Sequence, residues 1–163
     1  MIRRAFGLLS VVLLAGCAAP QLRGTGDLGL VIERASGQVT LIDTSRGVPY
    51  ARIDGLGDLS HASVVYSRDG RYAYVFGRDG GLTKVDLLES RIVKRVLQSG
   101  NAIGGSISQD GRIVVAQNYK PGGIKAFDSE SLEVLSEVPA EYAPGSFSKV
   151  VGLADLSANR FAY

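Results

Sequence analysis

Two stretches of the sequence that repeat each other decide the fold. They are YSRDGRYAYVFGRDGGLTKVDLLES at Tyr66–Ser90 and ISQDGRIVVAQNYKPGGIKAFDSES at Ile107–Ser131. Asp86 in the first and Asp128 in the second lie 42 residues apart, and a weaker copy, LVIERASGQVTLIDTSR, places Asp43 another 43 residues upstream. A period of about forty residues with several short strands per repeat is typical of a β-propeller.

Each complete repeat is predicted to form four strands. Runs of Tyr, Val and Ile alternate with Asp-Gly and Gly-Gly pairs, which is the pattern of strands joined by tight hairpins. The expected strands are residues 62–66, 71–76, 82–86 and 92–97 in the second repeat, and 104–108, 113–118, 124–128 and 134–138 in the third. The aspartate that recurs at the end of the third strand is interpreted as a structural cap.

The two ends of this pattern are incomplete. The first repeat begins near its second strand, and a fourth begins in KVVGLADLSANRFAY, residues 149–163, and stops in its second strand. We therefore expect an all-β protein, a β-propeller of four-stranded antiparallel blades of which about three and a half are present. Such a set cannot close a ring and leaves sheet edges open, so the sequence is interpreted as the N-terminal part of a longer propeller.

The first residues are predicted to be a targeting segment. Arg3 and Arg4 precede an apolar run at residues 5–15, which is typical of a secretory signal. Leu-Ala-Gly-Cys at 14–17 resembles a bacterial lipobox, and Cys17 is the only cysteine. The expected organisation is a lipoprotein signal at 1–16, a lipidated linker at 17–28 and the propeller at 29–163. Because Ala18 follows the cysteine, we expect a periplasmic protein anchored to the outer membrane. The alternative is an ordinary signal with a stray cysteine.

Composition excludes several function classes. The 18 basic and 16 acidic residues are scattered and nearly balanced, so no nucleic-acid-binding surface is indicated. One histidine without a nucleophile motif is too little for a Ser/His/Asp triad. No Cys/His cluster with metal-ligand spacing occurs.

The candidate site residues are expected on one face of the propeller. Strands alternate in direction within a blade, so turns leading into an innermost strand share a face with turns between the second and third strands. This places the only histidine, His61, on the same face as the hairpin residue Arg78. Neighbouring blades add further candidates at equivalent turns: Arg34, Asn101, Tyr119 and Lys120, with Lys149 from the fourth unit. Arginine binds carboxylates, tyrosine stacks on flat rings and imidazole binds metals. The alternative, that these are ordinary solvated loop residues, stays open.

Segments throughout the sequence resemble a known protein family. SRDGRYAYVFGRDGGLTKVDL, preceded by DLSHAS, resembles the haem d1-binding propeller of cytochrome cd1 nitrite reductases, and more closely the NirF family of exported propellers needed to make haem d1. LRGTGDLGLVIERASG, GNAIGGSISQDGR, NYKPGGIKAFD and KVVGLAD extend it over nearly the whole chain. The resemblance implies an eight-bladed propeller and, as cofactor, haem d1 or a dihydro-haem d1 precursor.

Roles for individual residues follow from the same resemblance. His61 falls close to the axial iron ligand of the nitrite reductases, which implies a metal-binding and catalytic role, and Arg78 matches an arginine that contacts the acidic side chains of the tetrapyrrole. Arg34, Asn101, Tyr119 and Lys120, which strand alternation rather than the resemblance places on the same face, are expected to help bind the cofactor. The chain has no Cys-x-x-Cys-His motif for a c-type haem, so nitrite reduction is not expected.

The resemblance implies a role in haem d1 biosynthesis and leaves three alternatives open. The protein binds a precursor and dehydrogenates it in a late oxidative step, carries it without catalysis, or is a protein-interaction propeller. The implied partners are the tetrapyrrole, other haem d1 assembly proteins and nitrite reductase, with the membrane contacted only through the lipid anchor.

Overall fold

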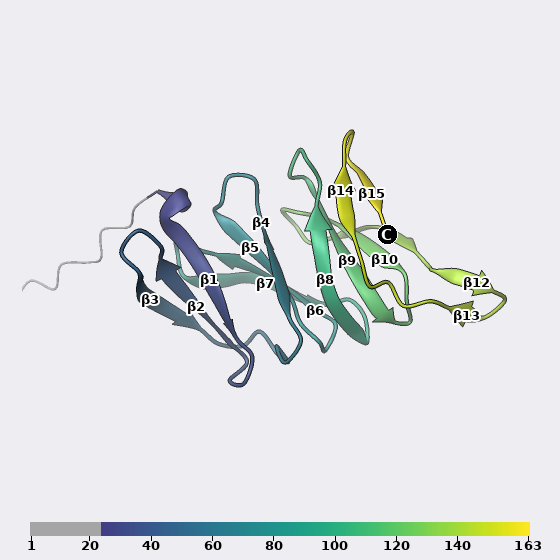
Figure 1. Cartoon of the computed structure of the whole chain (residues 1–163), viewed down its shortest axis with the longest axis horizontal. Helices are drawn as coiled ribbons and strands as arrows, with labels where there is room; N and C mark the ends of the chain where they lie inside the picture. The colour runs from purple at the N-terminus through teal and green to yellow at the C-terminus, as the bar shows by residue number, and fades with distance from the viewer. Residues whose placement is uncertain (1–23) are drawn as a thin grey trace, which may run out of the picture.

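The computed structural model describes residues 24–163, and these form an antiparallel all-β structure (Figure 1). Apart from one short 3-10 turn, η1 (Thr25–Asp27), every element of this part of the chain is a strand. Blade 1 contains β1 (Leu28–Glu33), β2 (Gln38–Asp43) and β3 (Val48–Ile53); blade 2 contains β4 (Ser63–Tyr66), β5 (Tyr72–Phe76), β6 (Gly81–Asp86) and β7 (Arg91–Leu97); blade 3 contains β8 (Asn101–Ile107), β9 (Ile113–Lys120), β10 (Ile124–Asp128) and β11 (Val134–Val138). No helix within residues 24–163 is long and apolar enough to cross a membrane.

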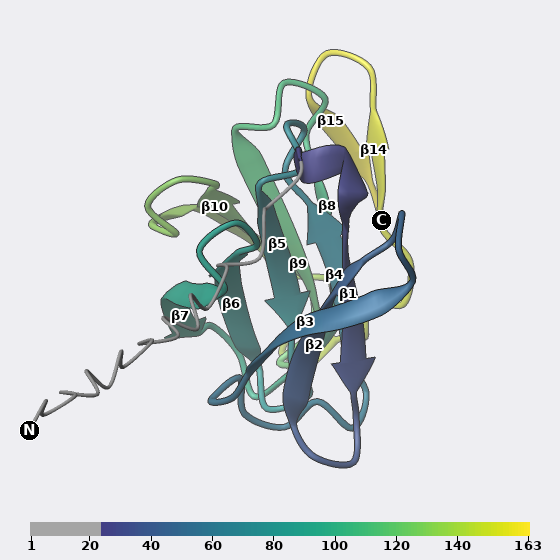
Figure 2. The ribbon, with the colours of Figure 1, turned by 90° about the vertical axis from the view of Figure 1, so that its left-hand side faces the viewer.

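The predicted blade architecture is confirmed. Blades 2 and 3 are four-stranded antiparallel sheets with the strands in sequence order, and blade 1 has three strands. β2, β6 and β10 end at Asp43, Asp86 and Asp128, so β1–β3 correspond to the second, third and fourth strands of the other blades. The blades stand in a row, and Figure 2 looks along that row with blade 1 nearest the viewer.

The chain after blade 3 forms two short hairpins. β14 (Ala154–Leu156) pairs with β15 (Arg160–Ala162), and β14 packs against β8, where the innermost strand of a fourth blade belongs. The other hairpin, β12 (Glu141–Ala143) with β13 (Ser146–Phe147), has no counterpart in the repeats and was not predicted.

Apolar side chains between adjacent blades form the core. The strands of blade 2 are sandwiched between blades 1 and 3, and every residue of β6 is buried, including Lys84 and Asp86. One cluster lies between blades 1 and 2, and a second lies between blades 2 and 3 around Phe76 and Phe127. At Gly105 of β8 an added Cβ would lie 2.2 Å from Phe76 Cζ, so the blades approach too closely there for a side chain.

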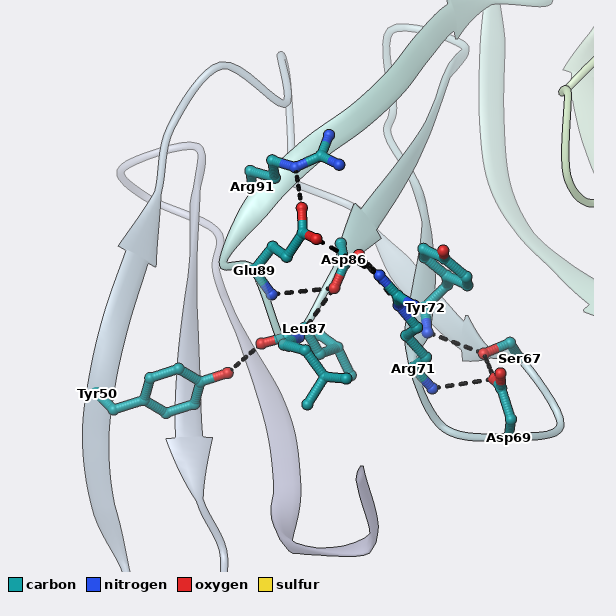
Figure 3. Close-up of polar contacts among 10 residues, drawn as sticks. Tyr50, Ser67, Asp69, Arg71, Tyr72, Asp86, Leu87, Glu89 and Arg91 are labelled. Carbon is teal, nitrogen blue, oxygen red and sulfur yellow. Dashed lines mark hydrogen bonds and ion pairs between the residues drawn. The ribbon is translucent and has the colours of Figure 1, made fainter. Parts of the chain in front are cut away.

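Asp86 shows how the recurring aspartate caps its strand (Figure 3). One carboxylate oxygen accepts hydrogen bonds from the N–H groups of Leu88 and Glu89, both at 3.0 Å, and the other accepts from the Arg71 guanidinium at 2.9 and 3.2 Å. Burial raises the pKa of this carboxyl, but the hydrogen bonds from Glu89 N–H and Arg71 outweigh burial, so its pKa lies below the usual value. Asp128 accepts equivalent bonds from Glu130 and Ser131. The interpretation of these aspartates as caps agrees with these contacts.

The strand directions separate two faces of the blade row. The turn between β1 and β2 lies at the lower edge in Figure 1, whereas the β4–β5, β8–β9 and β14–β15 turns lie at the upper edge. The lower edge, which also carries the β5–β6 and β9–β10 turns and the connections into β4 and β8, is called the site face below.

Two strand boundaries in blade 3 differ from the prediction. β8 begins at Asn101, three residues earlier than expected, and β9 continues to Lys120. The residues expected to form the β9–β10 hairpin therefore belong to the end of β9. The turn falls instead at residues 121–123, where Gly122 and Gly123 have positive φ values of 110° and 85°.

Candidate functional site

A cavity of about 160 Å³ opens on the site face between blades 2 and 3. It is lined by His61, Arg78, Asn101, Ile103 and Tyr119. Four of the six residues proposed from sequence to bind a cofactor are therefore brought together.

Each lining residue is positioned by a different element. His61 is in the connection that leads into β4, and Arg78 is in the β5–β6 turn. The backbone N–H of Arg78 donates to the carbonyl of Asp58 at 2.8 Å, which joins that turn to the connection carrying His61. Asn101 is the first residue of β8, and Tyr119 lies one residue before the end of β9.

Several polar groups at the cavity have no partner within residues 24–163. The Asn101 Oδ1 atom is buried and accepts no hydrogen bond there. The His61 imidazole makes no hydrogen bond with any other described residue. The Arg78 guanidinium makes no ion pair within that part of the chain, although, after hydrogen bonds from Ser60, its charge contributes to lowering the pKa of the Asp58 carboxyl. A buried amide oxygen without a partner costs roughly 1–3 kcal/mol, so this arrangement favours a bound polar group.

Tyr119 carries a further cation toward the site. Lys149 Nζ lies 5.3 Å from the centroid of its ring, a cation–π contact across the segment that precedes β14. Lys149 is thereby held next to a cavity-lining ring. Arg78 and Lys149 thus place one cationic side chain in the cavity lining and another beside it.

The remaining predicted residues lie apart from this cavity. Arg34 is exposed in the β1–β2 turn, and Lys120 is exposed at the end of β9, where it pairs with Asn101 in the backbone ladder. Neither side chain lines the cavity. Cys17, predicted to be lipidated, falls outside the described residues, as do the signal segment and most of the predicted linker; the linker's last residue, Leu28, begins β1.

Sequence reasoning missed an ion pair between Asp79 in the β5–β6 turn and Arg95 on β7. Asp79 Oδ1 accepts the Gly81 N–H at 3.0 Å, and its Oδ2 pairs with Arg95 Nη2 at 2.5 Å. Arg95 also donates through Nε to the carbonyl of Leu56 at 3.0 Å. Asp79 resembles a turn residue in sequence, and its partner lies 16 residues away on β7, so no local pattern revealed the pair.

A larger cavity on the opposite face is a weaker candidate. Its volume is about 340 Å³, and its lining includes the carboxylates of Asp69, Asp110 and Glu130. The cations there are already engaged: Arg68 donates to main-chain carbonyls of blade 3, and Lys84 donates to the Glu130 carbonyl while lying 4.2 Å from the Tyr72 ring centroid. An anionic ligand would be repelled from this cavity despite its size.

Comparison with known proteins establishes the family. The family model described as "Cytochrome D1 heme domain" matches residues 23–163. The chain belongs to the cytochrome d1 haem domain family. It is 58% identical to the protein NirF of Pseudomonas aeruginosa over 163 residues and 58% identical to that of Stutzerimonas stutzeri over 165 residues, and it spans 42% of the length of each. The resemblance to NirF stated from the sequence is confirmed.

Other known proteins are similar to this chain in sequence or structure. The dihydro-haem d1 dehydrogenase of Pseudomonas aeruginosa is 35% identical over 124 residues, which are 76% of this chain and 25% of that protein. A solved structure of the dihydro-haem d1 dehydrogenase NirN in complex with DHE aligns with a TM-score of 0.77 at 30% identity, covering 87% of this chain and 31% of the other. Hydrazine synthase from Kuenenia stuttgartiensis, at 23% identity and a TM-score of 0.61, shares the fold.

The cytochrome d1 haem domain family implies an iron tetrapyrrole, and the cavity residues fit part of one. An imidazole suits iron, a guanidinium suits the ring's carboxylates, and Tyr119 offers an aromatic face. Asn101 supplies an otherwise unpaired buried acceptor. Because sites that enclose a ligand typically measure about 300–1,000 Å³, a cavity of about 160 Å³ would accommodate only one edge of a macrocycle.

Proposed function

We propose that this protein takes part in haem d1 biosynthesis by binding a haem d1-type tetrapyrrole precursor at the cavity between blades 2 and 3. The observation that carries the proposal is the convergence of His61, Arg78, Asn101 and Tyr119 on one cavity in a chain of the cytochrome d1 haem domain family. The chain spans less than half of the relatives that it matches, so the activity of the whole protein is part of the proposal.

In this proposal each cavity residue has a separate task. His61 contacts the iron or exchanges a proton with the ligand, and Arg78 grips a peripheral carboxylate through charge-assisted hydrogen bonds. Tyr119, with Lys149 at its ring, lies against the macrocycle edge. Asn101 accepts a hydrogen bond from a donor on the ligand or from a water that the ligand traps. Arg34 and Lys120 would act only on parts of a ligand that extend beyond the cavity.

Two modes of action fit these contacts. The bound group would supply the redox chemistry, and the protein would supply orientation, electrostatics and a proton at His61. The likeness to a dihydro-haem d1 dehydrogenase favours an oxidative step, a dehydrogenation of the precursor. A carrier that binds and releases the precursor unchanged would need the same residues for affinity but not for turnover.

Export, anchoring and further partners also belong to the proposal. The sequence of residues 1–17 supports a lipid anchor at Cys17 in the periplasm, at the outer membrane. Other haem d1 assembly proteins and nitrite reductase are the proposed partners, since a finished cofactor has to reach its enzyme. Cys17→Ser should release the protein from the membrane fraction, and unchanged fractionation would contradict the anchor.

An absorbance titration tests the binding proposal. The full-length protein lacking its lipid anchor is titrated with haem d1, beside His61→Ala and Arg78→Met. We expect a saturable band shift in the parent protein, an altered band position in His61→Ala because the iron environment changes, and weaker binding in Arg78→Met with the band unchanged. Lys94→Met on β7 is the control, because Lys94 lies away from the cavity and donates to Ser131 O.

The outcomes separate the alternatives. An unchanged band in His61→Ala would contradict a role of His61 at the iron. The absence of any shift in the parent protein would leave only a protein-interaction propeller. Conversion of dihydro-haem d1 by the bound protein would separate the dehydrogenase from the carrier.

A further inference from the structure

Arg78 and Asp79 are neighbours in the β5–β6 turn, but their side chains have different surroundings. Arg78 lines the cavity and makes no ion pair within the described part of the chain. Asp79 turns inward, where it pairs with Arg95 and accepts the N–H of Gly81. Arg95 is therefore engaged in an ion pair with Asp79, whereas Arg78 makes no ion pair within the described residues.

The same ion pair joins the two loops that carry the site. Arg95 Nε donates to the carbonyl of Leu56, and Asp79 Oδ2 accepts the Asp58 N–H at 3.3 Å. The Arg78 N–H returns a bond to the Asp58 carbonyl at 2.8 Å. Two hydrogen bonds thus fasten the β5–β6 turn directly to the connection that leads to His61, and Arg95 on β7 adds a third link through Leu56.

The backbone packs closely around the Asp79–Arg95 ion pair. A Cβ at Gly57 would lie 2.2 Å from Asp79 Oδ2 and 2.3 Å from Arg95 Nη2, and Gly57 has a positive φ of 85°. A Cβ at Gly81 would lie 2.6 Å from Arg95 Nη2. The ion pair is packed between two glycines, so its geometry is held from both sides. The Arg95 and Asp79 side chains are 23% and 30% exposed, which limits screening by water.

We infer that Arg95 is a positioning residue of the site: by neutralising Asp79 it keeps the Arg78 guanidinium free to bind a ligand carboxylate and holds Arg78 next to His61. The inference rests on the proposed function for the identity of the ligand. Without Arg95, the Asp79 carboxylate loses its partner and the nearest uncommitted cation along the turn is Arg78. An Asp79–Arg78 pair would then compete with the ligand carboxylate.

This inference predicts an unusual pattern among three variants. Arg95→Met and Arg78→Met should each weaken haem d1 binding about tenfold, because each costs the ligand its charge-assisted contact with Arg78. Asp79→Asn should stay within about threefold of the parent, since its amide oxygen still accepts the Gly81 N–H. The double variant Arg95→Met/Asp79→Asn should return to that threefold range, because the Asp79 carboxylate no longer competes with the ligand for Arg78.

Two controls separate this role from general damage. Arg91→Met removes an arginine of the same strand β7 that pairs with Glu89, outside the cavity lining, and should leave affinity unchanged. Haem d1 methyl ester carries the same macrocycle without free carboxylates, and its affinity should be insensitive to Arg95→Met. Melting temperatures measured in parallel report loss of the ion pair itself.

A double variant that binds as weakly as Arg95→Met, or more weakly, would overturn the inference and leave Arg95 a structural residue. If the parent protein binds no haem d1, the proposed function fails and the inference is decided by chemical modification. Phenylglyoxal labelling of Arg78, read by peptide mass spectrometry, should slow in Arg95→Met and recover in the double variant. Equal labelling rates in all three proteins would refute the inference without any ligand.

Discussion

The three strand-capping aspartates offer an internal test of how hydrogen bonds to a carboxylate stabilise this fold. They occupy the same position in three blades but receive different numbers of bonds. Asp86 accepts two backbone N–H groups and the Arg71 guanidinium, Asp128 accepts two backbone N–H groups and a hydroxyl, and Asp43 accepts the Arg46 N–H alone. We expect the cost of alanine substitution to fall in the order Asp86, Asp128, Asp43.

The expected losses of unfolding free energy follow from the hydrogen-bond donors that lose their carboxylate acceptor. A buried N–H that loses a charged acceptor costs about 1–3 kcal/mol, and the N–H groups of these half-buried and exposed turn residues fall toward the lower end of that range. Arg71 is 39% exposed and keeps Glu89 at 3.6 Å, so its guanidinium adds little once Asp86 is gone. Asp86→Ala should therefore cost about 3 kcal/mol, Asp128→Ala about 2 kcal/mol and Asp43→Ala below about 1 kcal/mol. Asp86→Asn, which keeps one acceptor oxygen, should cost about half as much as Asp86→Ala.

Urea unfolding of the full-length protein at pH 7, followed by circular dichroism, measures these differences. The pKa of Asp86 is lowered in the folded protein, so its stabilising contribution is present above the unfolded value near 4 and is lost as the pH falls through the folded value. The gap between the parent protein and Asp86→Asn should stay constant from about pH 8 to 5 and narrow below about pH 4. Equal costs at Asp86 and Asp43, or a gap that widens in acid, would refute the reasoning.

Three other predictions concern contacts between and within blades. Gly105→Ala should cost at least about 1–3 kcal/mol in thermal unfolding, because the new Cβ meets Phe76 Cζ at 2.2 Å; an unchanged melting temperature would mean that the blades separate easily. Tyr50→Phe should cost about 1 kcal/mol in urea, since the hydroxyl donates to the Leu87 carbonyl and links blades 1 and 2; a neutral effect would show that water replaces the bond. Burial raises the pKa of Tyr74 to about 12, so the neutral phenol contributes fully to the stability of the fold below about pH 10, and this contribution declines as the pH rises toward 12. In an ultraviolet titration, Tyr74→Phe should remove the last phenol to ionise. Loss of a phenol that ionises earlier would contradict this.

Much of the fold was readable from the sequence because its signals are local. The Asp-Gly turns, the runs of β-branched and aromatic residues and the recurring terminal aspartate lie within single repeats, and they predicted the strands of blade 2 to within one residue. The shared face of His61 and Arg78 also followed, since strand alternation within a blade is enough to assign it. The β12–β13 hairpin did not follow, because it interrupts the repeat and has no equivalent in the other blades.

The tertiary structure decided which residues line the cavity. Tyr119 and Lys120 are neighbours on β9, so their side chains point to opposite sides of the sheet; Tyr119 lines the cavity and Lys120 is exposed. Which of the two turns inward depends on the register of β8 against β9, and that pairing shifts at Asn101 and again at Ala102. Bulges of this kind belong to the pairing of two strands, and the alternation of residues within one strand does not reveal them.

By itself the sequence determined the repeat, the blades, the family and the face on which a ligand could bind, because each depends on residues close together in the chain. Only the tertiary structure decided which cations remain available on that face. Arg34 lies apart from the cavity, Arg95 is neutralised by Asp79, and Arg78 alone among these arginines lines the cavity with its charge unpaired by any described residue. The physical reason is that an ion pair forms between groups that folding brings together. Asp79 pairs with Arg95 on β7, and not with Arg78, its neighbour in the sequence.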